Sequence, residues 1–293
     1  MRTFAGVVLT AITIVATTSG AHADAPAEQR TCLDDATPNS QRIAACSFII
    51  TDAAPAEPKD LARVYFARGN AHLALRDYDR ALADFAIATQ ADSTAYGPFN
   101  SRGLVFLRQK QFDRAIAEFD ESIRRNPKSP IPLVNRGDAY RGQGRLDRAL
   151  QDYDSAIAVN PNWANAYFGR AATLQQQSIS DFEGFLNEGR FEKLAIAEYG
   201  KVLQIAPRHA NALNNRGLLY QTLRKYDLAI ADFTQAIEIN PAATFLRNRA
   251  STYRMIRRFD LAIADYRKAL TVTQDDAQRK LIVKLLGQLG AAV

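Results

Sequence analysis

A unit of about 34 residues recurs along most of the chain and restricts its possible folds more than any other feature. Six copies begin at Ala62, Tyr96, Pro130, Ala164, Ala210 and Ala243, with nearly equal spacing except for a longer interval after Ala164. Each copy has an arginine followed by Gly or Ala in its first half. Its second half has an alanine and, one helical turn later, an aromatic residue. Such repetition predicts a stack of like units that bury their cores against one another.

The third copy shows why each unit is expected to be a helical hairpin. Its first half begins at Pro130, and Gly142 and Gly144 then interrupt the chain. The second half has apolar residues at helical spacing, namely Leu146, Ala149, Leu150, Tyr153, Ala156 and Ile157. Asn160-Pro161 ends this helix, because proline disfavours helical backbone at the preceding residue. The small side chains of Gly137 and Ala149 predict a close approach of the two helices.

These positions resemble the signature of the tetratricopeptide repeat (TPR) family, whose unit of about 34 residues is a helix-turn-helix. The resemblance covers residues 62–276, although Ser93 and Gln274 replace the closing proline and the signature tryptophan is absent. It implies an all-α solenoid wound as a right-handed superhelix. The expected repeats are residues 62–95, 96–129, 130–163, 164–209, 210–242 and 243–276, and the fourth contains an insert at 176–191.

The N-terminal segment predicts an exported protein. Residues 1–23 have a positive Arg2, an apolar run and the small-x-small sequence Ala21-His22-Ala23, which together are typical of a signal peptide. We expect residues 24–30 to be disordered and residues 24–61 to contain a degenerate half-repeat. The two cysteines of the chain, Cys32 and Cys46, both lie there and predict a disulfide, with a metal or redox pair as alternatives. The expected location is periplasmic or secreted, without a membrane span after cleavage, and an uncleaved anchor is the alternative.

Residues 277–293 predict one further amphipathic helix. Its apolar stripe consists of Leu281, Ile282, Leu285, Leu286 and Leu289. A solenoid needs a helix with one polar face to cover its last repeat, so we expect a cap. A dimerisation helix is the alternative.

The sequence contains no recognisable catalytic motif. Outside the signal segment the histidines are His72 and His209, without metal-ligand spacing, and neither a P-loop nor a nucleophile elbow is present. His72 takes the position of Tyr140 and is expected to pack in the core. The formal net charge of +6 is spread without a long basic run, which argues against a nucleic-acid partner. We therefore expect no enzyme activity, cofactor or metal.

One polar pattern is shared by all copies. The arginine before the small residue has an acid at one fixed position in the second half, which lies further along only in the copy with the insert. The pairs are Arg68 with Asp84, Arg102 with Glu118, Arg136 with Asp152, Arg170 with Glu198, Arg216 with Asp232 and Arg249 with Asp265. Because the pattern repeats, it predicts a structural ladder of arginine–carboxylate contacts. A row of anion-binding arginines is the alternative.

For a TPR protein, the resemblance implies a partner in the concave groove lined by the first helices. The groove positions, rich in amides and arginines, are Arg63, Asn70, Asn100, Arg108, Asp138, Arg141, Asn165, Gln175, Asn211, Asn214, Gln221, Arg247 and Arg254. Amides hydrogen-bond peptide backbone and arginines bind carboxylates, so a peptide or acidic segment is the expected partner. An ordinary solvated face is the alternative.

The insert is the one individual feature of the repeats. Phe182, Phe185 and Leu186 share a helical face within it and either lengthen the hairpin or contact a partner. The sequence as a whole predicts a non-enzymatic protein-binding scaffold. The alternative is a structural or assembly accessory of a cell-envelope enzyme or export complex that docks through its insert or its ends.

Overall fold

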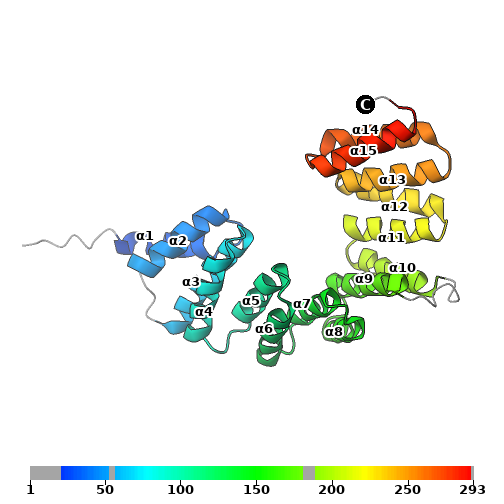
Figure 1. Ribbon diagram of the computed structural model, residues 1–293. Helices are drawn as coiled ribbons and strands as arrows, with labels where there is room; N and C mark the ends of the chain where they lie inside the picture. Colours follow the sequence, from blue (N-terminus) through cyan, green and yellow to red (C-terminus); the bar gives the residue numbers. More distant parts are fainter. Residues whose placement is uncertain (1–20, 53–56, 181–188, 292–293) are drawn as a thin grey trace, which may run out of the picture. The chain divides into compact units, whose positions relative to one another are not determined.

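The computed structural model describes residues 21–52, 57–180 and 189–291, and within these ranges the chain forms α-helices and no strand (Figure 1). The first 20 residues of the predicted signal peptide, and Phe182, Phe185 and Leu186 of the insert, lie outside the described residues. The helices are α1 (Ala21–Leu33), α2 (Asn39–Asp52), α3 (Pro58–Ala74), α4 (Tyr78–Ala91), α5 (Gly97–Arg108), α6 (Phe112–Arg125), α7 (Pro130–Gly142), α8 (Leu146–Val159), α9 (Ala164–Ser180), α10 (Arg190–Ile205), α11 (Ala210–Thr222), α12 (Tyr226–Ile239), α13 (Ala243–Met255), α14 (Phe259–Val272) and α15 (Asp276–Gln288). The all-α solenoid expected from the sequence is confirmed.

The chain forms two compact units that divide within α5, between Val105 and Phe106. In the first unit, α1 pairs with α2 and α3 pairs with α4, while α2 also packs on α3. Its cores gather around Phe85, which is fully buried beneath Gly69, and around the disulfide.

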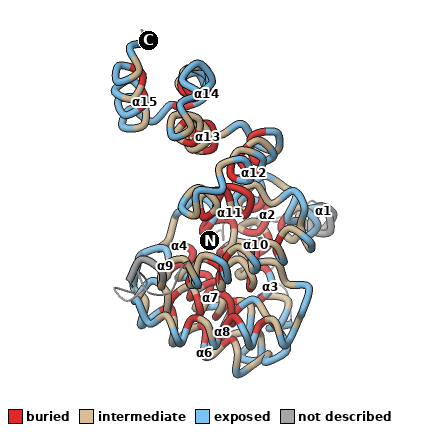
Figure 2. The backbone as a smooth tube through the Cα atoms, turned by 90° about the vertical axis from the view of Figure 1, so that its right-hand side faces the viewer, coloured by how far each residue is buried: buried red, intermediate tan, exposed pale blue. Residues whose placement is uncertain are grey.

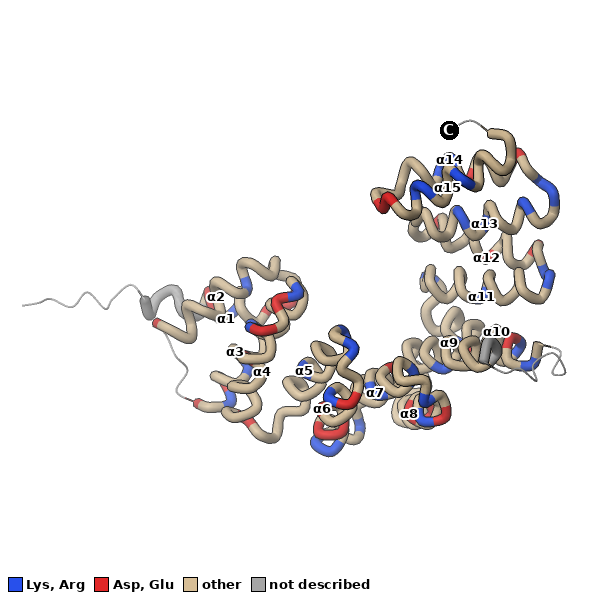
Figure 3. Tube along the Cα trace, viewed as in Figure 1, with Lys and Arg blue, Asp and Glu red and all other residues tan. Residues whose placement is uncertain are grey.

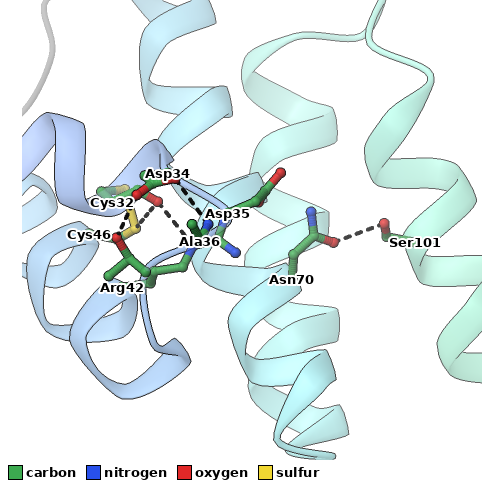
Figure 4. Close-up of polar contacts among 9 residues, drawn as sticks. Cys32, Asp34, Asp35, Ala36, Arg42, Cys46, Asn70 and Ser101 are labelled. Atoms are coloured by element: carbon green, nitrogen blue, oxygen red, sulfur yellow. Dashed lines mark hydrogen bonds and ion pairs between the residues drawn. A yellow bond between two sulfur atoms is a disulfide. The ribbon is translucent and has the colours of Figure 1, made fainter. Parts of the chain in front are cut away.

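The N-terminal part of the first unit corrects one expectation. Residues 24–30 belong to helix α1 and are not a disordered lead-in, because the helix packs on α2 and α3 and is tied at its end by the disulfide of Cys32. The segment expected to contain the half-repeat holds the helices α1 and α2, and its assignment as a half-repeat stays a prediction. The predicted disulfide between Cys32 and Cys46 is confirmed, and both cysteines are fully buried (Figure 4). Arg42 donates from Nε to the Cys32 carbonyl at 3.3 Å and bonds Asp35 at 2.9 Å.

In the second unit, first and second helices alternate along the stack. Hairpins α7/α8, α9/α10, α11/α12 and α13/α14 pack in sequence, and each first helix also packs on the second helix before it. First helices of neighbouring hairpins contact each other directly, α7 with α9 and α11 with α13. This places the first helices on one side, which we call the inner face. Buried residues run along the packed sides of the helices (Figure 2).

Small residues on the first helices make room for the large aromatic side chains of the second. A Cβ at Gly137 would lie 2.8 Å from Cε1 of Tyr153, and one at Gly169 would lie 2.4 Å from the same atom. The Tyr153 ring is therefore held between α7 and α9 and is fully buried. This contact joins two hairpins at once, which explains why the small and aromatic positions recur together.

The turn inside each hairpin uses a left-handed residue. Gly144 and Gly189 have φ of +75° and +69°. At the positions that correspond to Gly144, φ is between 57° and 62° in Arg76, Lys110, Arg224 and Arg257, a region that L-residues adopt at a cost of about 1 kcal/mol or more. The backbone of the turn is thus fixed by the packing of the hairpin even where glycine is absent.

The insert lengthens the fourth hairpin. Helix α9 has 17 residues, whereas α7 and α11 have 13 each. The first part of the insert therefore extends the first helix by about one turn.

At the C-terminal end, α15 packs on α14 and completes the last core. Ile282 and Leu286 are fully buried against a cluster that includes Leu246 and Tyr266. Leu281, predicted to lie in the same stripe, is instead 42% exposed. Helix α15 therefore caps the stack as expected, with a narrower apolar face than the sequence suggested.

Candidate functional site

The arginine–carboxylate ladder is present in five of the six repeats. Arg68, Arg136, Arg216 and Arg249 each donate from Nε and Nη2 to both oxygens of their aspartate at 2.6–2.9 Å. Arg170 reaches Glu198 at 2.7 Å through Nη2. The remaining pair, Arg102 with Glu118, has one residue in each unit and stays a prediction. The ladder thus joins first and second helices of one hairpin.

The third donor of several ladder arginines joins one hairpin to the previous one. Nη1 of Arg136 bonds Asp120 and Nη1 of Arg170 bonds Asp154, both at 2.5 Å. Nη1 of Arg249 donates to Thr234 at 2.9 Å. Hydrogen bonds to the carboxylates raise the pKa of Arg136 and Arg249 above the ordinary arginine value. These guanidinium groups are therefore committed to the scaffold and are not a row of free anion sites.

The predicted groove residues lie on first helices, with three levels of exposure. Arg63, Arg108, Asn165 and Asn211 are exposed, whereas Asn214 is only 7% exposed. The others are half-buried, namely Asn70, Asn100, Asp138, Arg141, Gln175, Gln221, Arg247 and Arg254. The groove assignment itself stays a prediction, but Asn214 has little surface to offer a partner.

Several of these amides bond across neighbouring hairpins. In the first unit, Ser101 Oγ donates to Asn70 Oδ1 at 3.0 Å (Figure 4). In the second, Asn248 donates to Asn214 at 2.8 Å, and Gln221 donates to Thr252 Oγ1 at 2.8 Å. The amides of the first helices therefore hold neighbouring first helices in register as well as lining the inner face.

The third hairpin contains a compact polar triad on the inner face. The Tyr153 hydroxyl donates to Asp138 Oδ1 at 2.9 Å, and Arg141 Nη2 donates to the same oxygen at 3.0 Å. Burial raises the pKa of Tyr153, and the Asp138 charge raises it further, so the phenol stays protonated at neutral pH. The Asp138 side chain is itself 33% exposed. A carboxylate at the surface can thus reach a tyrosine hydroxyl that belongs to the core.

The first unit has an apolar cavity of about 250 Å³ beside α3. Phe66, Tyr96 and Pro98 line it, together with Lys59 and Arg63. Gly97 lies against the Phe66 ring, where an added Cβ would stand 3.0 Å from Cζ. Of the predicted groove residues, Arg63 is the one that borders this cavity.

The two described histidines outside α1 take part in core packing and in helix capping. His72 is 5% exposed, and burial lowers its pKa despite the opposing charges of Asp84 and Asp77. Nδ1 of His209 accepts from the Ala212 amide at 3.1 Å and caps α11. Within the described ranges, His, Cys, Asp and Glu side chains form no group of three that could hold a metal ion. None of the described helices is both long and apolar enough to cross a membrane.

Comparison with known families matches the repeats directly. Models of the tetratricopeptide repeat match residues 66–130 and 210–242, and a TPR repeat model matches residues 137–178. The chain is a tetratricopeptide repeat protein. No curated protein sequence matches it significantly.

Several solved structures share this fold at low sequence identity. A TPR protein of Parabacteroides merdae superposes with a TM-score of 0.65 at 16% identity, covering 90% of this chain and 98% of the other. A thermophilic TPR protein of Thermus thermophilus gives 0.56 at 22%, covering 66% and 99%. PilF of Pseudomonas aeruginosa gives 0.63 at 13%, covering 78% and 99%. At these identities the comparisons show the fold alone.

Sequence reasoning missed how the buried tyrosines take part in the inner face. The sequence predicts a core role for the aromatic position, but the hydroxyls of Tyr153 and Tyr199 also bond first-helix side chains. The alternation between Phe and Tyr at that position was the available signal. A phenol in a core position needs a hydrogen-bond partner, and a phenylalanine does not.

Proposed function

We propose that this TPR protein is a non-catalytic scaffold that binds an extended segment of a partner protein along the inner face. The observation that carries the proposal is the composition of α9, α11 and α13. These three first helices contain no Asp or Glu. Helices α9 and α11 carry exposed or half-buried amides, and α13 carries the half-buried Arg247 and Arg254. Side-chain amides can bond both donors and acceptors of an extended backbone, and arginines bind carboxylates.

The exposed amides Asn165 and Asn211 support this proposal most directly, because no described side chain forms a hydrogen bond with either of them. They lie at the same position of α9 and α11, at the second residue of each helix. Two such amides on adjacent hairpins present repeated hydrogen-bonding groups to one strand of a partner. The ladder arginines Arg170 and Arg216 bond the second helices of their hairpins, and they therefore hold in place the first helices that carry Asn165 and Asn211.

The test is site-specific photocrosslinking in the native host. A benzophenone amino acid replaces Asn165 or Asn211 in the full chain, and a matched control carries it at Lys268, which is exposed on α14. Inner-face positions should crosslink a defined polypeptide that the control position does not, and mass spectrometry of the crosslink should place it on one continuous segment. Equal labelling from all three positions would contradict groove binding.

Export is a second part of the proposal. The buried disulfide between Cys32 and Cys46 suits an oxidising compartment, and the sequence of residues 1–23 resembles a signal peptide. The purified protein should begin at Asp24 when isolated from its host, and cell fractionation should recover it outside the cytoplasm. An unprocessed N-terminus with reduced cysteines would refute export.

One observation favours docking through the end of the stack as a second candidate. Leu281 and Val283 on α15 are 42% and 41% exposed, although α15 is the helix that caps the last hairpin. An assembly accessory would use this surface, or the insert at 176–191, in place of the groove. Changing Leu281 and Val283 to Ser should then remove the partner, while benzophenone at Asn211 should give no crosslink.

A further inference from the structure

The last hairpin has a buried hydroxyl that its own hairpin does not satisfy. Tyr266 is fully buried, and its Oη has no hydrogen-bond partner among the described residues. The other two tyrosines at this repeat position are bonded, Tyr153 to Asp138 and Tyr199 to Asn215. Native structures rarely leave such a group without a partner, so each case needs an explanation.

Comparison of the third and sixth hairpins shows what is different. Tyr266, Arg254 and Ser251 occupy the repeat positions of Tyr153, Arg141 and Asp138, respectively. The tyrosine and the arginine are therefore kept, whereas the carboxylate that accepts from both is replaced by a serine. The sixth hairpin repeats the two donors of the triad without its acceptor.

The surroundings of Tyr266 are positive. Burial raises the pKa of the Tyr266 phenol, and the positive charges of Arg254 and Arg247 on α13 oppose this by lowering it. Neither arginine forms an ion pair with a described residue, and the bond of Arg254 to Gln288 at 3.3 Å has a neutral acceptor. Helices α11 and α13 carry no acid, and α15 has one, Asp276, at its first residue. Figure 3 shows basic segments along α13 and α15.

We propose that Tyr266, Arg254 and Arg247 form a carboxylate-binding site on the inner face of the last hairpin. A carboxylate of the bound partner takes the place that Asp138 takes in the third hairpin. It accepts from the Tyr266 hydroxyl and from Arg254, and Arg247 supplies a second positive charge. This inference rests on the proposed function, since it names the chemistry that the groove recognises at its C-terminal end.

The third hairpin shows that the geometry is attainable. The Asp138 carboxylate reaches the Tyr153 hydroxyl although Tyr153 is fully buried and the Asp138 side chain is 33% exposed. A carboxylate arriving from the inner face can make the same bonds once Arg254 turns from Gln288 toward it. Hydrogen bonds between a charged acceptor and these donors are about twice as strong as neutral ones.

The first experiment tests the site without any partner. The full chain is titrated with acetate against chloride at constant ionic strength, and NMR follows the Arg254 Nε–H and Tyr266 Cζ signals. We expect a saturable shift of both signals. Ser251→Asp restores the internal carboxylate of the third hairpin and should abolish the acetate response. Arg254→Gln should weaken binding at least about tenfold, which corresponds to about 1.4 kcal/mol.

Two further variants sharpen this test. Lys268→Gln removes the same charge from the outer helix α14 and should leave the acetate response unchanged. Asp138→Ser removes the internal carboxylate of the third hairpin and should create a second response at Tyr153. Shifts that grow linearly in all variants, or a response that persists in Ser251→Asp, would overturn the proposal.

The second experiment identifies the source of the carboxylate. Fluorescein-labelled octapeptides of neutral sequence are compared in three forms: with a free C-terminus, with an amidated C-terminus, and amidated with one internal Glu. Preference for the first form assigns a chain terminus and preference for the third assigns an acidic side chain. Equal binding of all three overturns the site even if groove binding holds. Acetate binding without any captured polypeptide would instead refute the scaffold function alone.

Discussion

Gly200 interrupts the row of acceptors that joins neighbouring hairpins, and Gly200→Asp should complete it. Asp120 and Asp154 accept from Nη1 of the ladder arginine in the following hairpin. The corresponding residue before Arg216 is Gly200. Arg216 bonds Asp232 through Nε at 2.8 Å and Nη2 at 2.7 Å, and no described residue accepts from its Nη1. A Cβ at Gly200 would meet no atom within 4 Å, so an aspartate fits.

The expected gain has two parts. Replacing a helix-interior glycine by alanine stabilises by about 1 kcal/mol, and aspartate is up to about 0.7 kcal/mol worse than alanine, so propensity contributes about 0.3 kcal/mol. The new ion pair should contribute about 0.2–1 kcal/mol, as exposed pairs do. This range suits the site, because the side chains of Asp120 and Asp154 are 52% and 59% exposed. The total is about 0.5–1.3 kcal/mol.

Gly200→Ala is the control, and by propensity alone it should stabilise by about 1 kcal/mol. Because the two single variants have similar expected stabilities, only their coupling to Arg216 separates the effects. A double-mutant cycle of Gly200→Asp with Arg216→Met cancels the cost of leaving Asp232 unpaired. The cycle should give a coupling free energy of about 0.2–1 kcal/mol that is absent when alanine replaces Gly200.

The assay is urea unfolding followed by the fluorescence of Trp163, the one tryptophan of the chain, and by circular dichroism. Trp163 lies just before α9 and reports on the hairpin that contains Gly200. The coupling should shrink at about 1 M NaCl, because salt then screens exposed charges beyond about 3 Å. A coupling free energy of zero at low salt, or one that salt does not change, would refute the role assigned to the third donor.

Three other perturbations test the fold. Burial lowers the pKa of His72, so the unfolded protein binds more protons at this residue than the folded protein does. The free energy of unfolding should therefore be highest above pH 6.5 and fall below it, by at most about 1.4 kcal/mol per pH unit. In urea titrations, His72→Tyr should flatten this pH dependence. Gly169→Ala should destabilise the fold by about 1–3 kcal/mol, because the new Cβ clashes with Tyr153. Gly137→Ala should cost less, because the sixth repeat already has an alanine, Ala250, at this position beside Tyr266. Equal losses of stability would contradict the packing argument. Reducing the Cys32–Cys46 disulfide should lower the free energy of unfolding by about 3 kcal/mol. An unchanged melting temperature in the double variant Cys32→Ser/Cys46→Ser would exclude the disulfide as a stabilising link.

The sequence predicted the features that every repeat shares. The helical hairpins, the close approach at Gly137 and the arginine–carboxylate pairs all follow from residues that recur at fixed spacing. Such residues have the same neighbours in each copy, so one pattern identifies many contacts. The disulfide was predictable for a different reason, because Cys32 and Cys46 are the only cysteines in a chain whose sequence predicts export.

Features that depend on the packing of particular neighbours were not predictable. Asn214 and Asn211 are both first-helix amides, yet Asn214 turns toward Asn248 and is buried while Asn211 stays exposed. The side of the helix on which an amide ends up depends on the next hairpin. The helix over residues 24–30 depends on its neighbours in the same way. This helix is held by contacts with α2 and α3 that local composition does not reveal.

The repeated polar pattern is interrupted at Gly200, which leaves Nη1 of Arg216 without an acceptor among the described residues, and at Ser251, which leaves the Tyr266 hydroxyl without one. The two interruptions differ in their physical consequences. Arg216 lacks an acceptor for one donor among the described residues, but its side chain is 22% exposed, so water can solvate that donor at little cost. The Tyr266 hydroxyl is fully buried and has no hydrogen-bond partner among the described residues. An unsatisfied buried hydroxyl costs about 1–3 kcal/mol, and a binding partner that accepts from it recovers this free energy. The first interruption is therefore a matter of stability, whereas the second makes binding of a carboxylate favourable at the last hairpin.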